Sequence, residues 1–346
     1  MSGASIGFEL AGATAVFNAV ADVALKNAVR GVAIVAVTFW TRLAGALAMI
    51  LVFGAWVGYG HPVHIRDGGP IFGIPFLHAS PNVTFLLYST TESIILCLAA
   101  LLQFRAYQLS PISLCVPYIS FTPVFLIFTG WLFLNELPAP AKIAGIVVIV
   151  AGSFGMHRQL FARSPWEPLR AALQERGSRY MLLFAFLLAL TNPIDKRLVL
   201  MSDPIVQTFS YTVLSTLVFG LLLLRERDTA LHALRTNGRW LLASGLLQTF
   251  DLVLQFASLT FVAVVILISI KRCSIVLTVL LGWLVFKERQ IRDKLVASAV
   301  MLTGVLLIYL NIDVEAAYVI AAFAIVALGS YIFVVNRASA VDEARP

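Results

Sequence analysis

The sequence has few charged residues for its length. Only 12% of its 346 residues are Asp, Glu, Lys or Arg, whereas about 25% is usual for a soluble domain. The mean hydropathy is +0.91, because continuous apolar runs of about 20 residues, the length of a bilayer-spanning helix, recur along the chain. Runs that are continuous rather than alternating exclude a transmembrane β-barrel. The composition therefore predicts an all-α, polytopic membrane helix bundle.

Residues that could support enzyme or metal chemistry are also scarce. The three cysteines lie inside apolar runs without metal-ligand spacing, and His61 and His64 form only a loose pair in a loop. Residues 3–7 (Gly-Ala-Ser-Ile-Gly) match a nucleophile elbow in letters but lack its strand–turn–helix context. No phosphate-binding glycine loop is present. We expect no enzyme activity, no cofactor and no metal.

The net charge of +7 raises the question of a nucleic-acid partner. The Lys and Arg residues, however, stand between apolar runs, where they set the orientation of a membrane protein. We therefore expect membrane lipids and no nucleic acid as partners.

The apolar runs predict eleven spans and a polar connection at residues 158–179 that holds five arginines and divides the chain near its middle. The expected spans are 8–27, 33–58, 86–106, 111–134, 141–157, 180–200, 204–224, 239–259, 262–286, 294–311 and 316–335.

An internal repeat is the most specific signal. Residues 130–136 (Gly-Trp-Leu-Phe-Leu-Asn-Glu) recur as residues 282–288 (Gly-Trp-Leu-Val-Phe-Lys-Glu), and the same offset of 152 pairs Gln103-Phe104 with Gln255-Phe256. The first two spans of each half align at an offset of 170, which pairs Lys26 with Lys196. A longer connection after the second span, residues 59–85, explains the difference. Five helices are therefore duplicated, and an eleventh is added.

Five is an odd number, so the second repeat enters the membrane inverted relative to the first, as in many secondary transporters. Loops after odd-numbered spans carry 16 Lys or Arg residues and loops after even-numbered spans carry 4, which predicts odd loops in the cytoplasm. The expected domains are a repeat at 1–157, a linker at 158–179, a second repeat at 180–311, and an additional helix and tail at 312–346. We expect an N-terminus outside and a cytoplasmic C-terminus.

The first repeat resembles a known family. A Ser110-Pro111 turn opens a span that contains Pro123 and ends in the 130–136 motif, and small residues at Gly145 and Gly152 follow. This arrangement resembles the EamA-type unit of the drug/metabolite transporter superfamily, and residues 262–310 look like a second copy. The resemblance implies ten helices around a central cavity that works by alternating access. The eleventh helix departs from that pattern.

Charges inside apolar spans are the candidate site residues, because each costs several kcal/mol unless it is paired or hydrated. Lys271 and Arg272 stand mid-span and are predicted to bind an anion, with Asp251 as counter-ion or proton-linked partner. If Asp251 neutralises one base, one acid against two bases still leaves a positive remainder. The plastid sugar-phosphate translocators of the same superfamily are similar here in having an adjacent Lys-Arg that contacts phosphate.

Further candidates for the substrate cavity are polar or aromatic. They are Tyr118 and Ser120 around Pro117, Asn192 before Pro193, and Trp40 and Arg42 early in the second span. Arg42 is expected either to snorkel or to gate the cavity. Glu92 is expected to cap a helix, and Asp195 to lie at the membrane interface.

These features predict a secondary transporter, an exporter or exchanger, of a small anionic or phosphorylated metabolite. A proton or a counter-substrate is the candidate coupling partner, and the cell membrane the expected location. Two alternatives stay open. One is an exporter of neutral or zwitterionic amino acids or drugs, and the other is a lipid flippase or a non-transporting scaffold.

Overall fold

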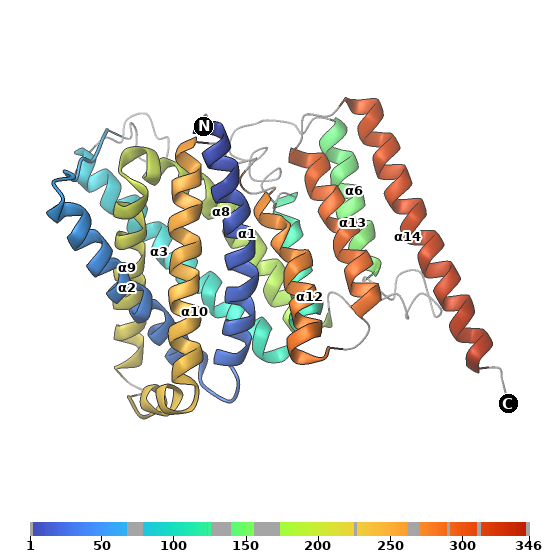
Figure 1. Cartoon of the computed structure of the whole chain (residues 1–346), viewed down its shortest axis with the longest axis horizontal. Coiled ribbons are helices and arrows are strands. Elements are labelled where there is room, and N and C mark those ends of the chain that lie inside the picture. Colours follow the sequence, from blue (N-terminus) through green and yellow to red (C-terminus); the bar gives the residue numbers. More distant parts are fainter. Residues whose placement is uncertain are drawn as a thin grey trace. The chain divides into compact units, whose positions relative to one another are not determined.

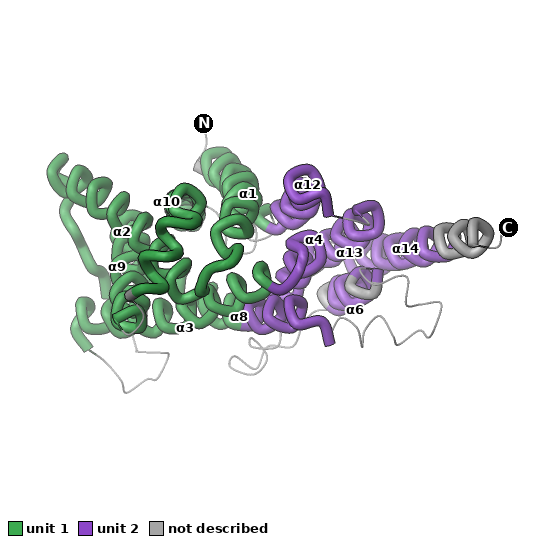
Figure 2. Tube along the Cα trace, turned by 90° about the horizontal axis from the view of Figure 1, so that it is seen from below, with its two compact units in different colours: residues 1–108, 187–271 green, residues 109–186, 272–346 purple. Residues whose placement is uncertain are grey.

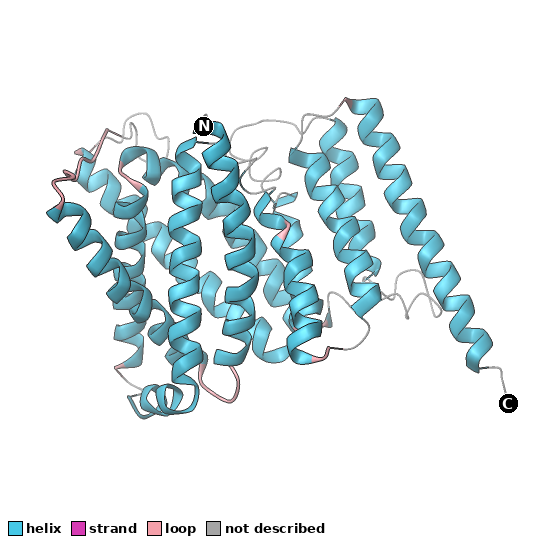
Figure 3. Ribbon diagram, viewed as in Figure 1, coloured by secondary structure: helices cyan, strands magenta, loops and turns pink. Residues whose placement is uncertain are grey.

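The structure, a computed structural model, describes residues 3–67, 79–122, 124–125, 140–155, 174–224, 227–261, 267, 270–288, 291–309 and 313–343. Throughout these ranges the chain forms helices joined by loops, with no strand (Figure 3). The all-α prediction is confirmed. Six of the described helices are long and apolar enough to cross a membrane: Ser5–Ala28, Ile34–Gly58, Pro81–Leu109, Pro204–Leu223, Asp228–Phe261 and Val314–Phe333.

The helices follow the expected order along the chain (Figure 1). Their bounds are α1 Gly3–Ala28, α2 Ile34–Gly58, α3 Pro81–Leu109, α4 Ile112–Cys115, the 3₁₀ helix η2 Val116–Phe121, α6 Pro140–Gly155, α8 Arg176–Met201, α9 Pro204–Leu223, α10 Arg227–Phe261, α12 Ser274–Phe286, α13 Ile291–Tyr309 and α14 Val314–Glu343. The expected eleventh span corresponds to α14.

The described part of the fourth span, predicted at 111–134, is not a single α-helix. A single turn, α4, is followed by the tighter 3₁₀ helix η2, which contains Pro117 at its start. Proline has no main-chain N–H to donate, so it disfavours continuation of the α-helical ladder at this point. Pro123 and the 130–136 motif lie outside the described residues.

The chain divides into two compact units (Figure 2). Unit 1 comprises residues 1–108 and 187–271, and unit 2 comprises residues 109–186 and 272–346. Unit 1 therefore holds the first three spans of both sequence repeats, with residues 187–201 of α8 as the first span of the second repeat. Unit 2 holds the last two spans of each repeat together with α14. The compact units thus cut across the sequence halves.

Small residues set the helix packing in unit 1. There α1 packs along α10, and α2 packs against both α9 and α10. A Cβ atom at Gly245 of α10 would lie 2.4 Å from the main-chain oxygen of Thr41, and one at Gly45 would lie 2.1 Å from Oγ1 of Thr249. The backbones of α2 and α10 therefore approach more closely than larger residues at Gly45 and Gly245 would allow, as is common between membrane helices.

The same device operates in unit 2, between α6 and α13. A Cβ atom at Gly304 would lie 2.7 Å from the main-chain oxygen of Gly145, and one at Gly152 would lie 2.6 Å from Cγ of Met301. Small residues at these positions therefore allow α6 and α13 to pack closely. The helix α14 belongs to the same packed unit, since Ala321 and Leu328 share an apolar cluster with Val148 of α6.

Candidate functional site

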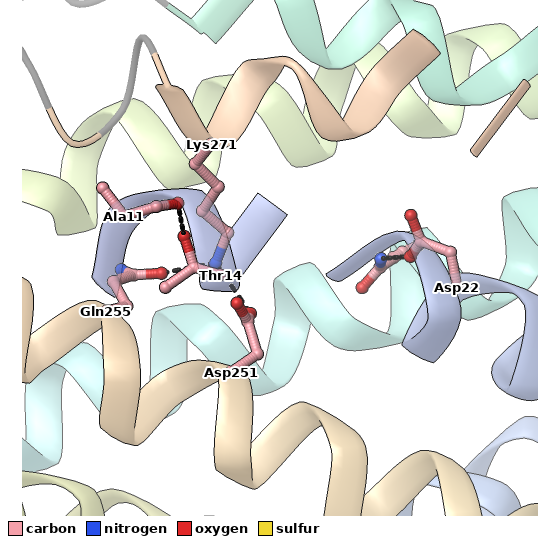
Figure 4. Close-up of polar contacts among 7 residues, drawn as sticks. Ala11, Thr14, Asp22, Asp251, Gln255 and Lys271 are labelled. Carbon is pink, nitrogen blue, oxygen red and sulfur yellow. Dashed lines mark hydrogen bonds and ion pairs between the residues drawn. The ribbon is translucent and has the colours of Figure 1, made fainter. Parts of the chain in front are cut away.

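An ion pair inside unit 1 joins two of the predicted site residues. Lys271 Nζ lies 2.8 Å from Asp251 Oδ2 and donates a second hydrogen bond, 2.5 Å long, to Oε1 of Gln255. Figure 4 shows the lysine extending toward both side chains. The Lys271 side chain is 16% exposed and that of Asp251 is 8% exposed, and Asn18 of α1 also contacts Asp251. The sequence anticipated this pairing as an open alternative, but not the part played by Gln255.

Gln255 is a repeat-related position. Its counterpart, Gln103 of α3, lies 3.4 Å from Asp22 Oδ1, and Tyr107 donates a 2.6 Å hydrogen bond to the same oxygen. Each repeat thus uses the equivalent glutamine to contact an ionisable side chain, a base in one repeat and an acid in the other. The glutamine is thus common to both repeats, whereas the side chain that it contacts is Asp22 in the first repeat and Lys271 in the second.

Arg272 follows Lys271 directly and begins the second segment of unit 2. Its side chain is buried, with 8% of the residue exposed, which is unusual for arginine. Tyr118 and Ser120 also belong to unit 2 and lie fully buried in η2. Ser120 Oγ has no hydrogen-bond partner among the described residues.

The remaining predicted residues, Trp40, Arg42 and Asn192, belong to unit 1. Trp40 Nε1 donates a 2.9 Å hydrogen bond to the main-chain oxygen of Ala230, so this indole ties α2 to α10. The Arg42 guanidinium lies 5.3 Å from the ring centre of Tyr211 in α9, within cation–π range. Asn192 is 9% exposed, and its Nδ2 has no partner in the described part of the chain.

Two acids lie buried among the helices of unit 1. Glu92 lies well inside α3 and is 0% exposed, so it does not cap a helix as expected, and Asp195 of α8 is 5% exposed. The two carboxyl groups are within hydrogen-bonding reach of each other. Gln207 of α9 donates to Glu92 Oε2 at 2.5 Å. A lone acid in the apolar run of residues 86–106 was the signal in the sequence.

Glu288, by contrast, does cap a helix. Its carboxylate accepts hydrogen bonds of 3.0 Å from the main-chain N–H groups of Ile112 and Ser113, at the start of α4. Lys294 Nζ donates a 2.8 Å hydrogen bond to Ser113 Oγ. Glu288 belongs to the 282–288 motif of the second repeat, whereas α4 belongs to the first repeat. The contact therefore links the two repeats within unit 2, because the carboxylate accepts from N–H groups that a helix start leaves without a partner.

Glu175 plays the corresponding role at the start of α8. Its carboxylate accepts from the main-chain N–H groups of Gly177 and Ser178 and from the Ser110 hydroxyl. Burial raises the pKa of this carboxyl, but the hydrogen bonds from Ser110, Ser178 and Gly177 outweigh it, so the pKa of Glu175 lies below its ordinary value.

Chemically, unit 1 offers a buried base paired to an acid, and a second pair of acids close to it. The charge of Lys271 acts on Asp195 as well as on Asp251. Among the described residues no group of three or more His, Cys, Asp or Glu side chains could hold a metal ion. The arrangement suits the binding and release of charged groups, and buried ionisable residues of this kind mark substrate and ion pathways in membrane proteins.

An internally duplicated, all-helical bundle of span-length helices with buried ionisable groups is the architecture of a multi-pass membrane transporter. The comparison with family models makes the assignment specific. The EamA-like transporter family matches residues 5–158 and 176–310, so both repeats are covered and the chain belongs to this family. Its members are membrane transporters.

Two further comparisons complete the assignment. No curated protein matches the sequence. A solved structure titled "Crystal structure of protein" is similar over 88% of this chain and 96% of its own, with a TM-score of 0.51. At 14% identity this likeness shows the fold alone.

Proposed function

We propose that this transporter carries a small anionic or phosphorylated metabolite by alternating access, as an exporter or exchanger. The buried Lys271–Asp251 ion pair, followed directly by the buried Arg272, is the observation that supports the proposal. Lysine supplies a compact positive charge and arginine a fork that fits carboxylate or phosphate, so adjacent residues of these two types suit an anion.

The ion pair also suggests how the substrate binds and leaves. In the empty transporter, Asp251 neutralises Lys271, since an unpaired charge in a low-dielectric interior costs several kcal/mol. An entering anion replaces Asp251 as a partner of Lys271, and Gln255 continues to accept from the ammonium. On release the carboxylate takes its place again, so neither state leaves the lysine without a partner.

The test is uptake by proteoliposomes of a panel of phosphorylated, carboxylated and neutral metabolites. Lys271→Gln and Arg272→Gln should abolish uptake of the anionic members. Removing one partner of a buried ion pair costs about 3–5 kcal/mol, so the double variant Lys271→Gln/Asp251→Asn, which buries no unpaired charge, controls for folding. Normal transport by the double variant would contradict a substrate role for the pair.

A second candidate is export of neutral or zwitterionic amino acids or drugs. The ion pair itself favours it, because Lys271 and Asp251 together present one positive and one negative partner to a zwitterion. Thermal stabilisation decides between the two candidates, since a ligand at 100 times its Kd stabilises by about 2.7 kcal/mol. Stabilisation by zwitterions and not by anions would favour the second candidate.

For orientation, we propose a cell-membrane location with the N-terminus outside and the C-terminus in the cytoplasm. The excess of Lys and Arg in loops after odd-numbered spans supports this arrangement. Labelling of single cysteines placed at Arg235 and at Asp203 from one side of the membrane should modify only one of them. Labelling of both from the same side would contradict the orientation.

A further inference from the structure

The two acids Glu92 and Asp195 form a buried cluster that the proposed anion site does not use. They come from α3 and α8 within unit 1 and are 0% and 5% exposed. Their carboxyl groups are within hydrogen-bonding reach, yet two carboxylates cannot hydrogen-bond to each other because neither has a donor. A proton held between them resolves this geometry.

Acceptor oxygens around the pair lack donors. Glu92 Oε1 and Asp195 Oδ1 have no hydrogen-bond donor among the described residues. Gln207, 0% exposed, points its amide at Glu92, and its own Oε1 is also without a donor. An unsatisfied buried polar atom costs about 1–3 kcal/mol, so several acceptors at one place indicate that a positively charged or proton-bearing species belongs there.

Titratable groups near the pair come from several elements. Lys271, after α10, acts on Asp195, and Tyr211 of α9 interacts with both acids, while Arg42 of α2 interacts with Tyr211 and with Cys97 of α3. Glu92, Asp195 and Asp251 are three acids, and Lys271 is the base whose charge acts on two of them. A bound proton reduces this excess of negative charge, which a low-dielectric interior favours.

We propose that Glu92 and Asp195 together bind one proton, and that this proton is the ion coupled to transport. Its binding is linked to the anion site through Lys271, whose charge acts on both Asp195 and Asp251. An anion bound to Lys271 weakens the attraction between the lysine and Asp195, so Glu92 and Asp195 hold their shared proton more tightly. By reciprocity the bound proton favours the anion, and the two travel in the same direction.

The coupling step rests on the proposed function, but the proton site does not. Infrared spectroscopy of the purified full-length protein detects the C=O band of a protonated carboxyl without any substrate. The wild-type protein should show such a band at neutral pH, and it should be lost in Glu92→Gln and in Asp195→Asn. Asp228→Asn, which changes an exposed acid of unit 1, should leave the band unchanged.

A band that persists in both variants would overturn the proton site, and so would its absence from the folded wild-type protein. A band that Na⁺ displaces at constant pH, together with Na⁺-dependent thermal stabilisation lost in Asp195→Asn, would overturn it in favour of a sodium site. If a variant fails to fold, Glu92→Asp is used in its place because it keeps a carboxyl group at residue 92. This substitution should retain the band, at a shifted pH. Loss of the band there, with the fold intact, would also count against the proposal.

Coupling is tested separately, with the substrate that the uptake panel selects. Proteoliposomes loaded with a pH-sensitive dye should acidify as the anion enters, and Asp195→Asn should abolish acidification while retaining substrate-induced thermal stabilisation. Acidification unchanged in Asp195→Asn would overturn the coupling alone. A panel in which no anion is transported would instead contradict the proposed function and leave the infrared result standing.

Discussion

The Lys196 ammonium donates a 2.5 Å hydrogen bond to the main-chain oxygen of Leu259, two residues before α10 ends. In the other repeat, Lys26 donates to the main-chain oxygen of Tyr107, two residues before α3 ends. Lys26 and Lys196 are 170 residues apart and the two carbonyls are 152 apart, so the structure reproduces both offsets of the sequence repeat. Each lysine places a positive charge at the negative end of a helix dipole.

Removal of the contact between Lys196 and the Leu259 oxygen should destabilise unit 1. A hydrogen bond from a charged donor contributes about 1.5–3 kcal/mol, so Lys196→Met should lower the Tm measured in detergent. Arg235→Met, at an exposed position of α10, should leave the Tm unchanged. Equal effects of the two substitutions would show that the carbonyl contact contributes nothing specific.

Truncation of the Glu288 side chain should open the start of α4. Glu288→Ala leaves the N–H groups of Ile112 and Ser113 without acceptors, at a cost of about 1–3 kcal/mol, whereas Glu288→Gln keeps one acceptor oxygen and should cost less. The measurement is the Tm of both variants. A glutamine variant no more stable than the alanine variant would contradict the capping role.

Addition of one methyl group should separate α6 from α13. Gly304→Ala places a carbon 2.7 Å from both the Gly145 oxygen and Ile149 Cγ1, and overpacking of this kind costs about 1–3 kcal/mol. The control is Gly329→Ala on α14, where nothing lies within 4 Å and alanine favours the helix. The first variant should lose thermal stability and the second should not. Similar melting of both would argue against close packing at Gly304.

Stability should fall at acidic pH through Glu175. Because its pKa is lowered in the folded protein, its contribution is fully present above the unfolded pKa of about 4.3 and is lost as pH falls through the folded pKa. The Tm difference between wild-type protein and Glu175→Gln should therefore shrink as the pH is lowered from about 7 to about 3. A difference that grows over this range would reverse the assigned sign.

Much of the fold could be predicted from the sequence because bilayer crossing leaves a direct signature. An apolar run of span length must become a helix, since no water is present to hydrogen-bond an open backbone. The predicted spans 33–58 and 204–224 accordingly match α2 and α9 within a residue. The 3₁₀ segment within the fourth span was not predicted, because hydrophobicity cannot separate an α-helix from the 3₁₀ turn around Pro117.

The candidate site could be predicted in part. Lys271 and Asp251 were identified as ionisable residues inside apolar runs, and the structure places them 2.8 Å apart. Gln207 and Gln255 were missed, since a neutral amide in a span carries no signal of its own. Glu92 was noticed but assigned to a helix cap, because distance from a predicted helix end says little about what a side chain faces. Its meeting with Asp195 was not predicted.

The sequence by itself determined the membrane class, the duplication and the family resemblance. The first follows from local hydrophobicity, and the other two follow from motifs that recur along the chain. Tertiary structure alone decided which helices pack into which unit and which polar groups meet. Helices from both repeats assemble in unit 1, so Glu92, Asp195 and Gln207 come together from three separate spans. Contacts between residues more than 100 positions apart depend on how whole helices pack, which no local pattern of residues encodes.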